Sequence, residues 1–104
     1  MTENMKNGIV QRIVRNLLDI QILKLTRAQP MWGYRIKQRV EKDFGVKIRH
    51  GVLYPLLNKM ENEGLLASHK ESIGRRIRKT YEITEKGLGL VSIYEEVLRE
   101  QMQK

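Results

Sequence analysis

The sequence contains no cysteine, and this absence removes disulfide bonds, thiolate zinc sites and cysteine nucleophiles together. Its two histidines, His50 and His69, have no cluster of acidic residues near them in the sequence, so we expect no metal site and no cofactor. A nucleophile–base pairing and a phosphate-cradling glycine loop are also missing. The sequence therefore predicts a protein that is not an enzyme.

Long apolar runs are missing as well. No stretch of about 18 apolar residues occurs, so a membrane-spanning helix is excluded. The N-terminus lacks the basic-then-apolar pattern of a signal peptide, and we therefore expect a cytoplasmic protein without a membrane partner. A chain of 104 residues fits a single domain, and 6% aromatic residues allow only a modest core.

What the chain does have is positive charge, which is unevenly spread. Twenty basic and 12 acidic side chains give a net charge of +8. Residues 1–83 carry 17 of the basic and eight of the acidic groups, whereas residues 84–104 carry three and four. A basic body with a near-neutral tail indicates a part that binds a polyanion and a part with another role.

The N-terminal part has a helical pattern. Apolar residues recur at steps of three and four, which predicts one long helix with a possible bend over about residues 9–28. Asn16, followed three residues later by Asp19, leaves open a fresh helix start that would split this segment. The apolar face is wider than one-sided packing needs, which indicates deep burial or contact with a second subunit. Residues 1–8 are polar, and we expect them to be frayed.

Two shorter helices follow. After an extended pair at 31–32, which could form one bridge of a small sheet, the pattern predicts a helix over about residues 34–44 that ends at Gly45. A third helix is expected over about residues 51–62. Pro55 has no N–H to donate, so it belongs in the first turn of that helix or marks a kink.

The remaining chain predicts a hairpin and a last helix. Residues 65–71 and 77–83 are strand-like, and the linker 72–76 carries the turn. Thr84 then has the character of a helix N-cap, and the final helix continues to about Met102.

Three helices followed by a basic hairpin are the order of a winged helix. We therefore predict a mainly α (α+β) fold, a winged helix-turn-helix with a two-stranded wing and a C-terminal dimerisation helix. Residues 1–83 would form the DNA-binding domain, and residues 84–104 the dimerisation helix, which is not an independent domain. The apolar, near-neutral last helix and the wide first one favour a homodimer.

This order suggests which residues contact double-stranded DNA, because the major groove is wide enough to admit a helix. On the third helix the candidates are Arg49, His50, Gly51, Val52, Tyr54 and Asn58. On the wing they are Arg75, Arg76, Arg78 and Lys79. Tyr34 and Arg35 on the second helix are candidates for the DNA backbone. The alternatives are a merely solvated hairpin tip and, for Tyr54, a half-buried aromatic.

Candidate dimerisation residues lie on the first and last helices. They are Ile9, Ile13, Leu90, Tyr94, Val97, Leu98 and Gln101. Tyr94 could line a pocket between subunits, although dimer packing explains it equally well. Trp32, the single tryptophan, precedes the second helix, and we expect it to pack in the core or at its shoulder.

Three stretches resemble the PadR-like (phenolic-acid-decarboxylase regulator-like) transcriptional regulators. They are ILKLTRAQPMWGYRI at 22–36, IRHGVLYPLLNKMENEGLL at 48–66 and GRRIRKTYEITEKG at 74–87, about two-thirds of the chain. The resemblance implies a winged-helix domain and a homodimer formed through the C-terminal helix, usually with help from the N-terminal one. It also implies repression at a palindromic operator, with Gly51 to Tyr54 opening the recognition helix and the four wing cations on the wing.

The chain departs from this family at the entry to the third helix. Where the family often has Ser-Pro and then Gly-Thr, this sequence has Arg49-His50 and Gly51-Val52. The family's phosphate and base contacts are therefore in doubt at Arg49, His50 and Val52. An alternative is that Arg49 and His50 bind phosphate while Val52 touches a thymine methyl.

Three functions remain in view. The leading hypothesis is a sequence-specific, homodimeric transcriptional regulator, and a repressor if the resemblance holds. A non-specific basic protein that coats DNA, or a winged helix that binds an acidic protein, are the alternatives. No small-molecule effector follows from the sequence.

Overall fold

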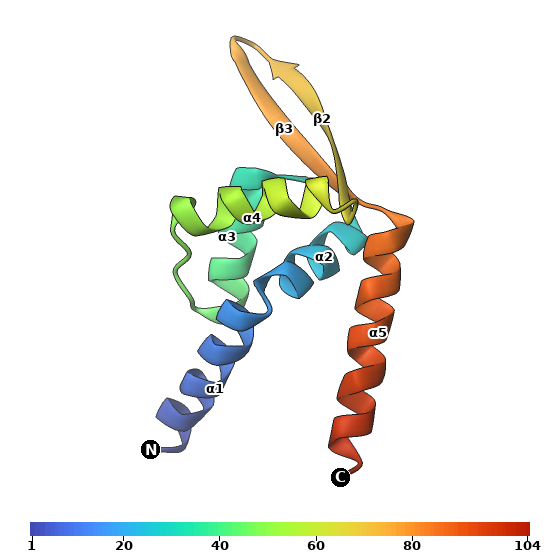
Figure 1. Ribbon diagram of the computed structural model, residues 1–104. Coiled ribbons are helices and arrows are strands. Elements are labelled where there is room, and N and C mark those ends of the chain that lie inside the picture. The colour runs from blue at the N-terminus through green and yellow to red at the C-terminus, as the bar shows by residue number, and fades with distance from the viewer.

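The computed structural model describes all 104 residues and contains five helices and three strands (Figure 1). In chain order they are α1 (Thr2–Asn16), α2 (Leu18–Ala28), β1 (Met31–Trp32), α3 (Gly33–Phe44), α4 (His50–Asn62), β2 (Leu66–Ile73), β3 (Arg76–Ile83) and α5 (Glu85–Met102). This order confirms the predicted winged helix-turn-helix, with β2 and β3 as the wing.

The N-terminal part differs from the prediction. Residues 9–28 form two helices rather than one, because the chain leaves helical geometry at Leu17, with φ −121° and ψ 38°. Asn16 does not cap the second helix. Its amide instead donates to the carbonyl of Arg12 at 2.7 Å. The expectation of a frayed start is also wrong, since α1 begins at Thr2.

The break at Leu17 explains the wide apolar face in the sequence. Six of the 11 residues of α2 are buried, whereas α1 buries only Val14. One straight helix would present a single face, but the break turns α2 into the core and leaves α1 outside it. The apolar residues of the two halves therefore serve different surfaces.

The middle helices form as the pattern predicts, each beginning one residue earlier. Gly45 follows α3 in a left-handed conformation, φ 64°, which a residue without Cβ adopts readily. Pro55 lies in the interior of α4, so the carbonyl of Gly51 has no helical donor.

The sheet is antiparallel, with the strand order β1-β3-β2. Met31 and Trp32 pair with Tyr81 and Thr80, which confirms the expected bridge. The wing strands are longer than predicted, because Ile73 pairs with Arg76 and leaves a turn of only two residues. Gly74 opens this turn with φ 63°. Because a glycine at the tip allows this tight turn, the strands continue through most of the five-residue linker that was expected.

A continuous core of 16 buried residues joins α2, α3 and α4 to the base of the sheet. The helix α5 is fixed to it at its first turn. The hydroxyl of Thr84 accepts a hydrogen bond from the backbone amide of Gly87 at 3.1 Å, as the predicted N-cap requires. The same hydroxyl donates a hydrogen bond to the carbonyl of Gly64 at 2.6 Å. Val91 continues the contact into the core, where it is fully buried.

The two terminal helices extend away from this core. In Figure 1 the wing projects at one end of the molecule, while α1 and α5 lead to the two termini at the other. They give the molecule an elongated shape of 50 × 31 × 21 Å. None of the helices combines the length and apolar character needed to cross a membrane.

Candidate nucleic-acid interface

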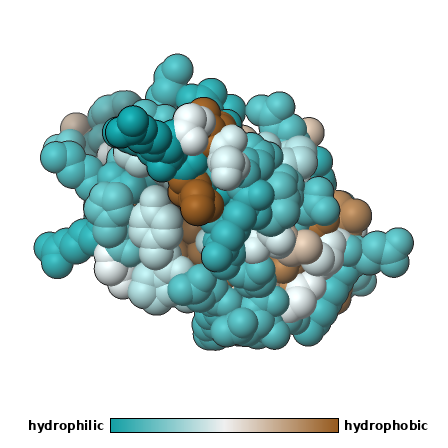
Figure 2. Space-filling model, turned by 90° about the horizontal axis from the view of Figure 1, so that it is seen from above, coloured by the Kyte–Doolittle hydropathy of each residue, from teal (hydrophilic) through white to brown (hydrophobic).

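The helix α4 and the wing lie at the same end of the molecule. In Figure 1 α4 crosses beneath the wing, which rises beyond it. Figure 2 views this end from above and shows a mainly hydrophilic surface with small hydrophobic areas. One end of the molecule therefore presents both a helix and a projecting strand pair to a partner.

One face of α4 is open to solvent along its length. Gly51, Pro55, Asn58 and Asn62 recur at helical spacing and are all exposed, while Leu53, Leu57 and Met60 are buried on the other side. Val52, at the N-terminal end, has 53% of its surface exposed. The exposed face thus combines the side-chain amides of Asn58 and Asn62, which donate and accept hydrogen bonds, with the apolar side chain of Val52. Side chains of both kinds can read base edges.

The entry to α4 is held by a carboxylate. Glu41 on α3 accepts the amide of Ile48 at 2.8 Å and pairs with Lys37 at 3.2 Å. The Ile48 amide, with smaller contributions from Lys37 and Lys47, lowers the pKa of Glu41. This bond fixes the segment that leads to Arg49 and His50, whose side chains are both exposed.

Tyr54 is half-buried and locked in place. Its ring stacks on that of His50, with centroids 5.5 Å apart and an interplanar angle of 4°. On its other side it meets the backbone of α3, where a Cβ on Gly33 would lie 2.9 Å from the Tyr54 ring. The structure therefore shows Tyr54 as the half-buried aromatic, whose ring packs against α3 and supports His50.

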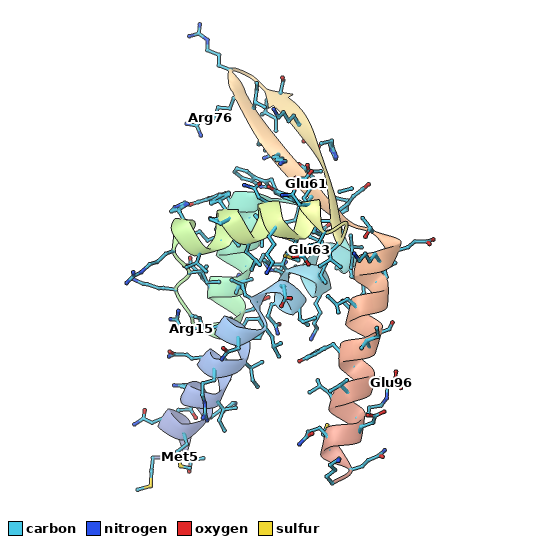
Figure 3. The ribbon with its side chains drawn as sticks, viewed as in Figure 1. Met5, Arg15, Glu61, Glu63, Arg76 and Glu96 are labelled. Atoms are coloured by element: carbon cyan, nitrogen blue, oxygen red, sulfur yellow. The ribbon has the colours of Figure 1, made fainter.

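Arg75 and Arg76 lie at the wing tip and make no ion pair. Figure 3 shows the Arg76 side chain extending away from the hairpin. Ile77 beside them is 71% exposed. The tip therefore carries two exposed, unpaired cations next to an exposed apolar side chain.

Arg78 is bound differently. Its guanidinium lies over the ring of Trp32, 4.6 Å from the centroid, and its Nε is 3.8 Å from a carboxylate oxygen of Glu71. That Nε is buried and has no hydrogen-bond acceptor. Trp32 is half-buried beside Tyr34 and Arg78 and is not among the side chains packed against the core, so the expected core contact is replaced by one that the sequence did not indicate.

Lys79 is engaged in a structural contact. Its ammonium is 2.7 Å from the carboxylate of Glu61 at the end of α4, and Ser68 donates to the same carboxylate. The hydrogen bonds from Lys79 and Ser68 lower the pKa of Glu61, and the bond to Glu61 raises the pKa of Lys79. The ion pair thus joins the base of the wing to α4 (Figure 3 labels Glu61).

The helix α3 contributes its first turn. Tyr34 and Arg35 are both exposed there, and the Tyr34 ring is 5.4 Å from that of Trp32. Tyr34 therefore lies next to the aromatic ring that carries Arg78, which brings one of the two α3 candidates close to a wing cation.

The sequence did not indicate two cations that make no ion pair in the structure. A groove of about 840 Å³ beside the entry to α4 is lined by Arg15 and Lys47 together with Arg49 and His50. Apolar and basic residues alternate over 46–49, and this pattern was the signal in the sequence that could have indicated an exposed Lys47. For Arg15 there was none, because its position follows from the break after α1.

The candidate dimerisation residues lie away from this end. Ile9 and Ile13 on α1 are 48% and 43% exposed, and Val97 and Leu98 on α5 are 54% and 41% exposed. Leu90 and Tyr94 are half-buried, and Gln101 is exposed. In Figure 3 Glu96 points to the side of α5 away from α1.

Comparison with known proteins gives a consistent picture. The family model of PadR-like transcriptional regulators matches residues 22–91. No curated protein matches the chain. Among solved structures, a PadR family transcriptional regulator from Eggerthella lenta is 28% identical, with a TM-score of 0.78 over 98% of this chain and 89% of that one.

Two further structures are similar. A PadR-like transcription factor from Bacteroides fragilis is 27% identical, with a TM-score of 0.78 over 92% of this chain and 93% of that one. A transcriptional regulator from Clostridium thermocellum shares the fold at 23% identity, with a TM-score of 0.75 over 88% of this chain and 92% of that one. The family and these neighbours are regulators and not enzymes.

Proposed function

The chain belongs to the PadR-like family of transcriptional regulators, and from this premise we propose that it is a sequence-specific, homodimeric repressor that binds a palindromic operator. The observation that carries the proposal is the exposed face of α4 beneath a projecting wing whose two tip arginines have no acidic partner. DNA as a partner is in keeping with the cytoplasmic location and the absence of a membrane partner that the sequence predicts.

In this proposal α4 enters the major groove and the wing follows the backbone. Asn58 and Val52 read base edges, by hydrogen bonds and by contact with a thymine methyl respectively. Arg49 and His50 bind phosphate at the entry to α4, where the Glu41 bond to Ile48 holds the segment in place. Arg75 and Arg76 supply charge at the tip, and Tyr34 and Arg35 contact the backbone beside them.

The homodimer is supported by two helices that the core leaves uncovered. The only buried residue of α1 is Val14, and α5 is exposed from Glu96 to its end. Isolated helices of this length are marginal in water unless an apolar face is packed. A second copy that covers Ile9, Ile13 and Val97 would supply that packing.

Selection from a random duplex library tests the proposal. A two-fold dimer places its two α4 helices in successive major grooves about 34 Å apart, so the selected sites should contain a dyad with half-sites one helical turn apart. A footprint on a selected site should be symmetric. Selected sequences without a dyad, or no enrichment at all, would contradict the proposal.

The net charge of +8 favours one other function, a non-specific protein that coats DNA. Such a protein binds with a steep salt dependence and little preference for sequence. Competition between a selected duplex and random duplex at one salt concentration separates the two functions. We expect the selected duplex to win by at least about a thousandfold, the lower end for specific DNA-binding proteins.

A further inference from the structure

Trp32 and Arg78 meet because of the sheet register. Trp32 is the last residue of β1 and pairs with Thr80 on β3. Arg78 lies two residues before Thr80, so its side chain leaves the strand on the same face. Since β1 ends at Trp32, β3 has no strand beside Arg78 on that side, while β2 pairs with it on the other, and the guanidinium lies against the indole, 4.6 Å from its centroid.

This contact leaves the donors of Arg78 unused. A guanidinium carries its five N–H groups in its plane, and stacking on a ring occupies the face and not the edge. The nearest carboxylate, that of Glu71, is 3.8 Å from Nε and too distant for a hydrogen bond. Lys79, the next residue, has by contrast a carboxylate 2.7 Å from its ammonium. Arg78 is thus fixed in place without a hydrogen-bond acceptor.

We propose that Trp32 is a positioning residue for DNA binding, which holds the Arg78 guanidinium on the wing, two residue pairs below its tip, so that its N–H edge binds a backbone phosphate. The ring restricts the rotamers of a long side chain before DNA arrives, so less freedom is lost on binding. The inference rests on the proposed DNA-binding function and assigns to the tryptophan a role other than the core packing that the sequence suggested.

A double-mutant cycle tests this role. We measure the affinity of the wild type, Trp32→Leu, Arg78→Ala and the double variant for one duplex recovered by the selection above. Arg78→Ala should weaken binding about tenfold, as expected for a charged hydrogen bond, and reduce the salt slope by about 0.9. Trp32→Leu should weaken it about fivefold. The double variant should bind as Arg78→Ala does, within about twofold, because the ring acts through the guanidinium.

Two controls separate positioning from structure. Arg76 is a tip cation that makes no contact with the ring. In the Arg76→Ala background, Trp32→Leu should therefore still weaken DNA binding about fivefold. Trp32→Phe should weaken binding only about twofold, because a smaller aromatic face remains for the cation. Thermal unfolding checks that each variant is folded. If Trp32→Leu is not, the cycle is run with Trp32→Phe, whose effect should likewise vanish in Arg78→Ala.

The possible failures are distinct. An effect at Trp32 that persists in the Arg78→Ala background would overturn the inference, and so would an Arg78→Ala variant that binds like the wild type. In both cases the proposed function would stand. A wild-type protein that binds no duplex at 50 mM salt would remove the proposed function and the inference together.

Discussion

Four cations within five residues of the wing occupy three different environments. Arg75 and Arg76 are free at the tip, Arg78 is stacked on Trp32, and Lys79 is paired with Glu61. Charge that is already neutralised contributes little to the attraction of a polyanion. These residues should therefore differ in their effect on DNA binding, although the sequence gives them the same formal charge.

The tip and the helix should affect binding in different ways. Arg75→Ala should weaken binding to all duplexes alike and reduce the salt slope by about 1, because a phosphate contact carries no sequence information. Asn58→Ala should leave the slope unchanged and relax base preference at one position, at a cost of about 1–3 kcal/mol. Binding titrations at several salt concentrations, on selected and scrambled duplexes, measure both quantities. An unchanged slope for Arg75→Ala would show that this arginine does not touch phosphate.

Glu61 gives a prediction about pH. Its pKa is lowered in the folded chain by the hydrogen bonds from Lys79 and Ser68, so its contribution to stability is present above its ordinary pKa of 4.5. That contribution is lost as pH falls below 4.5 toward the lowered pKa. Glu61→Gln should therefore reduce the free energy of unfolding by about 1 kcal/mol at pH 7.

The difference should shrink as pH falls below 4.5. Urea unfolding of the wild type and Glu61→Gln between pH 7 and pH 3 measures it directly. Glu63→Gln is a matched control, because the only contact of the Glu63 carboxylate is an ion pair at 3.8 Å with exposed Lys59. A gap between wild type and Glu61→Gln that stayed constant down to pH 3 would mean that the carboxylate charge is not what stabilises the contact.

At the scale of elements, the position of α5 depends on one close approach. A Cβ on Gly87 would lie 2.5 Å from the carbonyl oxygen of Leu65 and 2.7 Å from Ile83. Gly87→Ala should therefore displace the helix and destabilise the fold by about 1–3 kcal/mol, the usual cost of overpacking. Gly89→Ala, two residues on, meets nothing within 4 Å and should stabilise the fold by about 0.5–1 kcal/mol. Opposite changes in Tm are expected; a similar effect of both substitutions would argue against this packing.

The elements themselves were largely predictable, because each has a local signal. The αL glycine after α3 and the Thr84 cap both act within a few residues. The sequence left a split of the N-terminal segment open only through an Asn16 cap, which does not form. The break at Leu17 instead serves the burial of α2 against elements that come later in the chain. The same limit applies to the candidate site. Exposure of Asn58 follows from helical period, but the pairing of Lys79 with Glu61 depends on tertiary contact.

At the scale of the molecule, the proposed dimer predicts a sensitive position on α5. Val97 is 54% exposed on a helix that already carries Glu95, Glu96 and Glu100. Val97→Glu would bury like charges at the interface and should convert the dimer to a monomer at micromolar concentration. Light scattering or sedimentation measures the mass, and DNA affinity should fall with it.

Ser92→Glu provides the matched control. Ser92 is exposed and lies near Glu96 on the polar side of α5, so the same added charge should leave the mass unchanged. A wild-type chain that is monomeric at micromolar concentration would refute the proposed dimer. A Val97→Glu variant that remains dimeric would instead move the interface to another face.

The proposed dimer would make the function of the protein depend on its own abundance. When pairing completes the packing of α1 and α5, the share of paired chains depends on how many copies the cell contains. In the dilute range a doubling of copy number would raise operator occupancy about fourfold, because two chains must meet to make one binder. In the proposed repressor, gene dosage and protein turnover would then set the threshold of repression without any effector.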